Sequence, residues 1–334
     1  MSSIHQFVAS AFARRLATSS FAAAAVLVLT APLQAQAATI RIGHFPNITH
    51  VQALVAHALS RANKGWFEQR VGPDVKIEWY VYNAGPSAME AVFAKSIDLT
   101  YVGPNPAINA YSKSGGEEVR IVAGAADGGS ALVVQGDSKL RTPADFRGKK
   151  IATPQFGNTQ DVAARAWLVA GGLAIRQSGG DAQVLPAANP DQLSLFRQKQ
   201  VDAVWTVEPW VSRLELEAKG RVLIDDRSAI TTVLVARADY LRSQRDLVRK
   251  IVAAHAELTD WIKVNPAEAQ KLSVAELLAE TRATMSQQLI ERSWPRIVLT
   301  SSVSPEALTQ FFKSAQSVGF LRGTPDLSRL VEMP

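Results

Sequence analysis

A strand–turn–helix unit at residues 149–172 places the strongest limit on what this chain can fold into. Residues 150–153 have the pattern of the end of a short buried strand, and residues 154–157 form a turn. Apolar residues then recur at helical spacing until two glycines end the helix: Val162, Ala166, Val169, Gly171 and Gly172. A buried strand that leads directly into an amphipathic helix is the building unit of α/β folds.

The start of this helix is suited to binding an anion. Asn158 or Thr159 is expected to cap it, which leaves unpaired backbone N–H groups and about half a positive charge at its first turn. No Lys, Arg or His lies between Thr153 and Ala164, so the donors are neutral: peptide N–H groups and Asn158, Thr159 and Gln160. Such a site favours a small oxyanion that is held and then released. A capped helix with nothing bound is the alternative that these residues leave open.

Similar units recur along most of the chain. The predicted strands cover residues 39–43, 75–82, 97–102, 119–126, 131–135, 150–153, 182–185, 201–205, 221–224 and 232–236, and everything beyond Asp239 is predicted to be helical. Alternating strands and helices predict parallel sheets with helices on both faces.

Five predicted loops open at the carboxyl ends of strands, where open parallel sheets bind ligands. Gly, Pro, Asn, Ser and Thr are common in them, and these residues bring backbone N–H groups close to a ligand. The loops cover residues 45–49, 83–87, 103–106, 156–160 and 208–210. The sequence therefore predicts one crevice onto which several loops converge.

The first 37 residues are predicted to be a cleavable signal peptide. Arg14 and Arg15 form a basic region, residues 21–30 are apolar but too short to span a bilayer, and Ala35-Gln36-Ala37 fits the small-residue cleavage rule. A membrane anchor is the less favoured alternative, and the export route, general or twin-arginine, stays open. Without a Cys to take a lipid, we expect a freely soluble periplasmic protein that begins at Ala38.

Composition excludes several classes of protein. The chain carries a net charge of +6, and removal of Arg14 and Arg15 with the leader leaves about +4. This charge is spread out, whereas nucleic-acid binders cluster their Lys and Arg. The absence of cysteine excludes disulfides, thiol catalysis and Cys-zinc sites. No later apolar run approaches the roughly 20 residues of a membrane span.

The order of several short motifs resembles the periplasmic substrate-binding proteins of ABC importers for sulfonates, taurine, nitrate and related small anions. The resemblance covers essentially all of the chain after the leader, and the ordered set is more specific than any one motif. The motifs are Arg41-Ile42-Gly43, Ala84-Gly85-Pro86, Ser96-Ile97-Asp98-Leu99, Gly103-Pro104-Asn105-Pro106, Gly157-Asn158-Thr159-Gln160, Trp167-Leu168 and Glu208-Pro209-Trp210.

This resemblance implies a type II periplasmic binding protein: two doubly wound α/β domains with a ligand cleft between them. Domain I is expected at residues 38–127 plus 231–334 and domain II at residues 128–230, with hinge crossings near residues 127–130 and 225–231. The implied function is capture of a small oxyanion, first of all an organosulfonate such as an alkanesulfonate or taurine, by a monomer that delivers it to an inner-membrane permease. Nitrate, bicarbonate and an aromatic or pyrimidine-type ligand are the alternatives.

The resemblance also implies a set of ligand contacts. On the loops described above these are Phe45, Asn47, His50, Gly85, Asn105, Gly157, Asn158, Thr159 and Gln160, with Glu208 and Trp210 on the facing domain. Phe45 and Trp210 would form an apolar wall, which favours an organic tail on the anion. Glu208 would either cap the helix that follows it or pair with an ammonium on a zwitterionic ligand.

Catalysis and metal binding are not expected. Ser130 lacks the second glycine of a nucleophile elbow, and only His44 and His50 are near the predicted cleft, where His50 is expected to be neutral. His57 and His255 fall in helical patterns, and no carboxylate–histidine cluster is apparent around His57. We therefore predict no catalytic residue, no metal and no cofactor. The large aromatics Trp79, Trp167 and Trp205 are expected in the core.

Overall fold

The computed structural model describes residues 38–177, 179–323 and 325–334. The predicted signal peptide and its cleavage site lie outside these residues. Ala37–Pro334 forms one compact unit. Among the described residues, no helix has both the length and the apolar character needed to cross a membrane.

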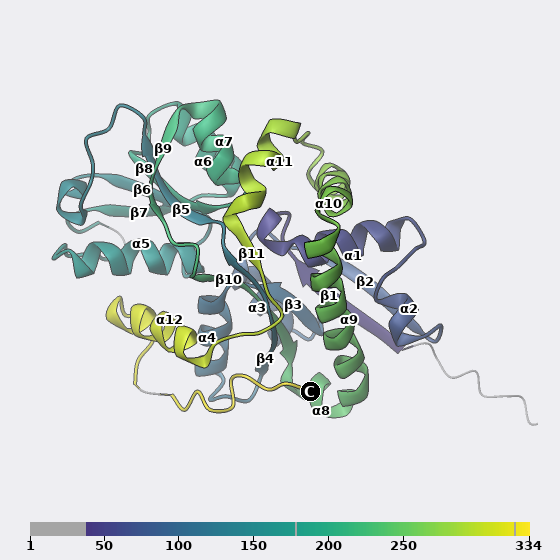
Figure 1. The fold of residues 1–334 in the computed structure, drawn as a ribbon. Coiled ribbons are helices and arrows are strands. Elements are labelled where there is room, and N and C mark those ends of the chain that lie inside the picture. Colours follow the sequence, from purple (N-terminus) through teal and green to yellow (C-terminus); the bar gives the residue numbers. More distant parts are fainter. Residues whose placement is uncertain (1–37, 178, 324) are drawn as a thin grey trace, which may run out of the picture. The chain divides into compact units, whose positions relative to one another are not determined.

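The first sheet has six strands in the order β11-β4-β10-β3-β1-β2 (Figure 1). Their bounds are β1 Ala38–His44, β2 Val75–Val81, β3 Leu99–Val102, β4 Val119–Gly128, β10 Ile230–Arg237 and β11 Ile297–Leu299. β1 runs parallel to both β2 and β3, while β10 is antiparallel to β3 and β4. Apolar side chains of this sheet are buried under helices on both of its faces.

The second sheet has five strands in the order β7-β6-β8-β5-β9. Their bounds are β5 Ser130–Gln135, β6 Lys150–Thr153, β7 Gln183–Pro186, β8 Ala203–Val207 and β9 Gly220–Asp225. β6 is parallel to β7 and β8, and β5 is antiparallel to β8 and β9. Strands β1–β4, β10 and β11 thus belong to one sheet, and the consecutive strands β5–β9 belong to the other.

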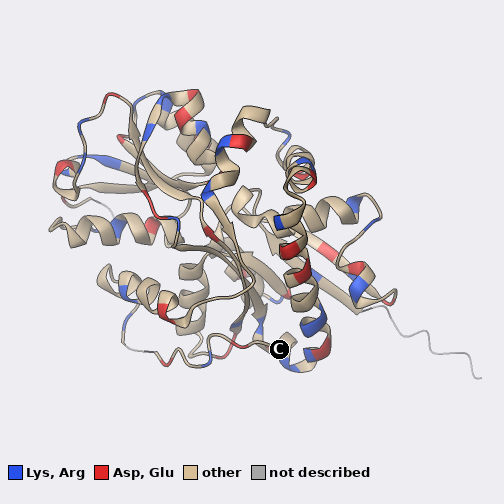
Figure 2. Ribbon diagram, viewed as in Figure 1, with Lys and Arg blue, Asp and Glu red and all other residues tan. Residues whose placement is uncertain are grey.

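Helices cover both sheets. In chain order they are η1 Ile48–His50, α1 Val51–Arg61, α2 Glu68–Val71, α3 Gly85–Phe93, α4 Pro104–Lys113, η2 Pro143–Phe146, α5 Thr159–Ala170, α6 Asn189–Arg197, α7 Trp210–Ala218, α8 Ala238–Ser243, α9 Arg245–Val264, α10 Pro266–Thr281, α11 Gln287–Ser293, η3 Trp294–Arg296 and α12 Pro305–Ser317. Helix α10 packs on α1, and α12 packs on α4 and α5. Lys and Arg are interspersed with Asp and Glu over these helices in Figure 2.

The α/β fold agrees with the prediction, but two details correct it. Each sheet is mixed rather than parallel, because β5 and β10 begin directly after the chain passes from one sheet to the other. A parallel strand needs a long crossover connection, and none precedes these two strands. The region after Asp239 is not entirely helical, since Ile297–Leu299 pairs with Ala126–Gly128 of β4. A three-residue strand is too short to show a periodicity that a sequence could reveal.

The first passage between the sheets is made by glycines. Gly128 and Gly129 both have a φ of +69°, a conformation that other residues adopt only with strain. A Cβ atom on Gly128 would also lie 2.4 Å from the carbonyl oxygen of Arg296. The chain can therefore turn between β4 and β5 only because these positions carry no side chain.

Candidate ligand-binding site

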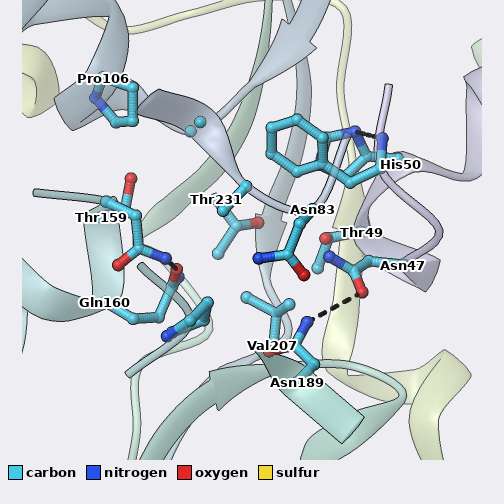
Figure 3. Close-up of a pocket in the computed structure, with 16 residues that line it drawn as sticks. Asn47, Thr49, His50, Asn83, Pro106, Thr159, Gln160, Asn189, Val207 and Thr231 are labelled. Atoms are coloured by element: carbon cyan, nitrogen blue, oxygen red, sulfur yellow. Dashed lines mark hydrogen bonds between the residues drawn. The ribbon is translucent and has the colours of Figure 1, made fainter. Parts of the chain in front are cut away.

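A small pocket lies where the starts of α3, α4 and α5 meet the loop after β1 (Figure 3). Its enclosed volume is about 30 Å³, enough for only a few atoms. Neutral side chains and backbone line it: Phe45, Asn47, Thr49, His50, Asn83, Ala84, Gly85, Gly103, Pro106, Pro154, Asn158, Thr159, Gln160, Asn189, Val207 and Thr231. The starts of α3, α4 and α5, with Asn189 at the start of α6, therefore face the pocket, and no Lys, Arg, Asp or Glu is among the described residues that line it.

Local hydrogen bonds hold the first turn of α5 in place. Asn158 Oδ1 accepts from the backbone N–H of Asp161 at 2.8 Å, so Asn158, one of the two caps that the sequence left open, is the one used. The buried Asp161 carboxylate accepts from Thr153 Oγ1 and from the Gly157 N–H, both at 3.0 Å. It also forms an ion pair with buried Arg165. The turn beside the pocket therefore contains one buried negative charge, Asp161, which is already paired with Arg165.

Thr159 offers an unused polar atom to the pocket. Its hydroxyl oxygen is buried and has no hydrogen-bond partner among the described residues. A buried hydroxyl without a partner is costly, so such an atom at a pocket wall indicates a place for a ligand. The start of α4 lies very close to it, because a Cβ atom on Gly103 would lie 2.3 Å from Thr159 Oγ1.

His50 contributes a neutral ring to the pocket. Burial, followed by the nearby charge of His44, holds the pKa of His50 well below its ordinary value of 6.5. The Phe45 N–H donates to His50 Nδ1 at 3.4 Å, which leaves Nε2 as the protonated nitrogen. The prediction of a neutral ring therefore agrees with the structure, and burial is the main cause.

Hydrogen bonds join the two sheets' loops beside the pocket. Asn47 Oδ1 accepts from Trp210 Nε1 at 3.2 Å and from Asn189 Nδ2 at 3.5 Å. The Ile48 N–H donates to the carbonyl oxygen of Glu208 at 3.0 Å. Figure 3 marks the bond between Asn47 and Asn189 with a dashed line. The loop after β1 is thus bound to the elements that follow β7 and β8.

The structure brings most of the predicted contacts together. Those that line the pocket are Phe45, Asn47, His50, Gly85, Asn158, Thr159 and Gln160, and those that do not are Asn105, Gly157, Glu208 and Trp210. Trp210 is linked to the lining by its hydrogen bond to Asn47. Phe45 is buried and packs against the His50 ring at a centroid distance of 4.4 Å, so it does not form an open apolar wall.

Glu208 points away from the pocket lining. Its carboxylate accepts from the Ser212 N–H at 3.1 Å and from Ser212 Oγ at 2.9 Å, within the first turn of α7. Arg296 of η3 pairs with it at 2.9 Å. Burial raises the pKa of Glu208, and the bonds to Arg296 and Ser212 only partly offset this effect. Of the two roles foreseen for Glu208, its position supports that of a helix cap.

Five lining residues lie outside the predicted loops: His50, Pro154, Asn189, Val207 and Thr231. Asn189 begins α6 after the edge strand β7, Val207 ends β8, and Thr231 lies on the second passage between the sheets. Asn189 follows a strand, as the residues of the other loops do. The Ala188-Asn189-Pro190 sequence therefore could have predicted a further loop at the pocket. Nothing in the local sequence marks Thr231 or Val207.

A larger apolar cavity of about 380 Å³ adjoins the pocket. Both share Thr159, Gln160 and Thr231, and the larger one is also lined by Trp167, Trp205, Phe311, Ile224 and Ile230 among others. The prediction that Trp167 and Trp205 belong to the core is therefore only partly right. Each packs partly against the core of the second sheet and lines this cavity.

The surroundings of His57 also differ from the prediction. Its ring lies within hydrogen-bond distance of His44, Glu276 and Glu280, although no carboxylate–histidine cluster was apparent around it. The two glutamates follow His57 by more than 200 residues, so no local spacing could show this. His255 lies in a helix, as its sequence pattern indicated, and is buried there, bonded to Tyr101 and to the carbonyl of Gly124.

Comparison with known proteins identifies the family. The NMT1-like family matches residues 33–279, most of the chain. The chain belongs to the NMT1-like family.

The chain is also similar to individual proteins. A binding protein of Brucella abortus (strain 2308) is 25% identical over 235 residues, 67% of this chain and 70% of that protein. An Escherichia coli (strain K12) protein that carries the name of an aliphatic sulfonates-binding protein is 28% identical over 192 residues, 55% of this chain and 57% of that protein.

Among solved structures, the alkanesulfonate-binding protein SsuA from Xanthomonas axonopodis pv. citri, bound to MOPS, has a TM-score of 0.72. It has 23% sequence identity, and the match covers 90% of this chain and all of that chain. This similarity shows that the chain has the periplasmic binding protein fold.

Proposed function

We propose that this protein is the solute-binding component of an ABC importer, that it captures a small organosulfonate in the periplasm, and that it delivers this ligand to an inner-membrane permease. The observation that carries the proposal is the meeting of three helix N-termini at a pocket without charged lining residues. Unpaired N–H groups at helix starts bind anions, and neutral donors hold an oxyanion without a permanent ion pair.

The adjoining cavity supports a ligand with an organic part. Thr159, Gln160 and Thr231 belong to the walls of both spaces, so a ligand could place its oxyanion at the start of α5 and its apolar part against Trp167, Trp205 or Phe311. Nitrate and bicarbonate have no such part. We therefore rank an alkanesulfonate or a related organosulfonate above these inorganic anions.

A neutral aromatic or pyrimidine-type ligand is the second candidate. Asn47, Asn83, Asn189 and Gln160 all line the pocket, and each amide supplies both a donor and an acceptor. Paired donors and acceptors suit a ring with polar edges as well as an anion. The absence of any Lys or Arg in the lining is compatible with either ligand.

A thermal-shift screen separates these candidates. The ligands are ethanesulfonate, taurine, an arylsulfonate, nitrate, bicarbonate, sulfate and a neutral aminopyrimidine. A specific ligand at a hundred times its dissociation constant should stabilise the protein by about 2.7 kcal/mol. Stabilisation by sulfonates but not by sulfate supports the proposal, stabilisation by the aminopyrimidine alone supports the second candidate, and no response to any anion contradicts an anion site.

Two domains that close on the ligand form part of the proposal. Residues 38–127 with 231–334 would make one domain and residues 128–230 the other, with hinges at the two passages between the sheets. Ligand should then lower the radius of gyration measured by small-angle scattering. An unchanged radius in a protein saturated with ligand would contradict hinge closure.

Export to the periplasm also belongs to the proposal. Cleavage after Ala37 is expected to release a monomer that begins at Ala38. Mass spectrometry of the protein from a periplasmic extract, together with light scattering for its oligomeric state, tests both points. Retention of residues 1–37 in the extracted protein would contradict release by cleavage.

A further inference from the structure

We infer that this protein has a metal site, separate from the ligand pocket, for a divalent cation with the coordination preferences of Zn²⁺. Its ligands are two histidines and two glutamates, here named the His–Glu cluster: His44, His57, Glu276 and Glu280. His44 ends β1, His57 lies in α1, and both glutamates lie one turn apart in α10. Helix α10 packs against α1 and is drawn next to it in Figure 1, which brings these distant residues together.

The distances within the cluster fit one shared ion. His44 Nε2 and His57 Nδ1 lie 2.9 Å and 3.0 Å from Glu280 Oε1, and 3.2 Å from each other. Adjacent ligand atoms of a tetrahedral zinc ion are about 3.3 Å apart when the bonds are 2.0–2.1 Å long. A slight outward movement of these three atoms would admit the ion. Glu276 Oε1, at 2.9 Å from His57 Nδ1, is placed to supply a fourth ligand.

Protons alone cannot satisfy these contacts. The two ring nitrogens can carry at most two hydrogens between them, yet they make four contacts of 3.2 Å or less. If both ring nitrogens carry a hydrogen, two donors face each other at 3.2 Å. If one ring nitrogen instead accepts a hydrogen bond from the other, the carboxylate next to it has no donor from that ring. A cation between the four groups would replace every one of these contacts by a bond to the metal.

Burial and charge also favour a cation. The side chains of His44, Glu276 and Glu280 are at most 1% exposed, and Glu280 Oε2 has no hydrogen-bond partner among the described residues. Arg61, which pairs with Glu276 at 2.8 Å, supplies one positive charge against the two carboxylates. Buried carboxylates need compensation, and a divalent cation provides it. Trp79 stacks on the His57 ring and packs edge-on against His44, which fixes both rings.

A route from solvent exists beside Arg61. Its side chain is half exposed and covers Glu276, and the His57 side chain is 9% exposed. Movement of this one arginine would open the cluster from the surface. A bound ion would then tie α10 to β1 and α1, next to the loop at Phe45 that enters the ligand pocket.

Titration of the chelator-treated full chain with ZnCl₂ tests the inference. We expect one saturable equivalent by calorimetry and a higher melting temperature. Glu280→Gln and His57→Gln should each weaken Zn²⁺ binding at least tenfold. Even the loss of a residue that only hydrogen-bonds to a metal ligand lowers metal affinity about 10–100-fold. Glu268→Gln, an exposed carboxylate on the same helix, is the matched control and should bind Zn²⁺ as the unmodified protein does.

X-ray absorption at the zinc edge of the unmodified protein gives a test that needs no variant. We expect both imidazole nitrogens and carboxylate oxygens at 2.0–2.1 Å. An oxygen-only shell, the lack of a saturable equivalent, or unchanged affinity in both folded cluster variants would overturn the inference.

Discussion

The ligand pocket and the His–Glu cluster lie on either side of the carboxyl end of β1, and they use polar residues in opposite ways. His44 points into the cluster, while Phe45 and Asn47 line the pocket. In the pocket the only titratable side chain is His50, whose pKa is lowered by burial. In the cluster all four side chains can carry a charge. The end of β1 thus separates the neutral ligand pocket from the His–Glu cluster, in which every side chain can ionise.

The difference has a physical reason. A buried charge must be paired, and a fixed cation in the pocket would have to be paired whenever the ligand is absent. Neutral donors avoid that requirement, so a ligand can enter and leave. The cluster has no such need to exchange partners, so its carboxylates can keep the same positive partners, among them Arg61 and the inferred cation. The following changes test this contrast, in order of decreasing expected effect.

Thr159→Val should have the largest effect, on ligand binding. The substitution keeps the shape of the side chain but removes the unpaired hydroxyl at the start of α5. A hydrogen bond to a charged ligand contributes about 1.5–3 kcal/mol, so sulfonate affinity should fall at least about tenfold by calorimetric titration.

Thr232→Val is the matched control for this change. Thr232 Oγ1 is likewise buried without a partner among the described residues, but it lines neither the pocket nor the adjoining cavity. Its loss should leave sulfonate affinity unchanged. Equal affinities in the two variants would mean that the ligand does not contact the Thr159 hydroxyl.

Gly103→Ala tests how closely α4 and α5 approach. The backbone of Gly103 is compatible with alanine, with a φ of −68°, but the new Cβ would lie 2.3 Å from Thr159 Oγ1. Such overpacking costs about 1–3 kcal/mol and should lower the melting temperature. Adding Thr159→Ala removes the clashing oxygen and should restore part of the loss. A double variant less stable than Gly103→Ala would show that the clash lies elsewhere.

The pH dependence of stability tests the cluster in the metal-free protein. Burial raises the pKa of Glu280, but hydrogen bonds from His44 and His57 outweigh it and bring the pKa to about 2. Burial lowers the pKa of His57, but the bonds to Glu276 and Glu280 outweigh it and leave the pKa raised. Arg61 pairs with Glu276, and its charge opposes protonation of His57.

The lowered pKa of Glu280 and the raised pKa of His57 affect stability in opposite pH ranges. The contribution of Glu280 is present above pH 4.5, its ordinary pKa, and is lost as the pH falls toward 2. That of His57 is present below pH 6.5 and is lost as the pH rises through its raised pKa. Urea unfolding with a chelator present should therefore show greatest stability between these values, with losses of about 1–2 kcal/mol outside them. If the Glu280→Gln variant loses as much stability at acid pH as the unmodified protein, Glu280 is not the source of that loss.

Glu208→Gln should have the smallest effect on the pocket. The carboxylate already bonds Ser212 and Arg296 and does not line the pocket. We expect affinities for ethanesulfonate and taurine to stay within about threefold, which is under 0.7 kcal/mol. Calorimetry with both ligands measures this. A large loss with taurine alone would show that Glu208 pairs with the ammonium of an amino-sulfonate.

The sequence by itself determined the local units of this protein. The bounds of β6 and the start of α5 were predicted from residues a few positions apart, and the cap of α5 was narrowed to Asn158 or Thr159, because helical spacing and capping depend on near neighbours. The loops at 45–49, 83–87, 103–106 and 156–160 were recognised for the same reason, and each supplies residues to the pocket.

Tertiary structure alone decided which distant residues meet. The pairing of Glu208 with Arg296, the short strand β11 and the four residues of the His–Glu cluster each join parts of the chain that are far apart in sequence. Asn189 and Thr231 reach the pocket in the same way. Such contacts depend on how helices pack on the two sheets, and a local pattern carries no record of that packing.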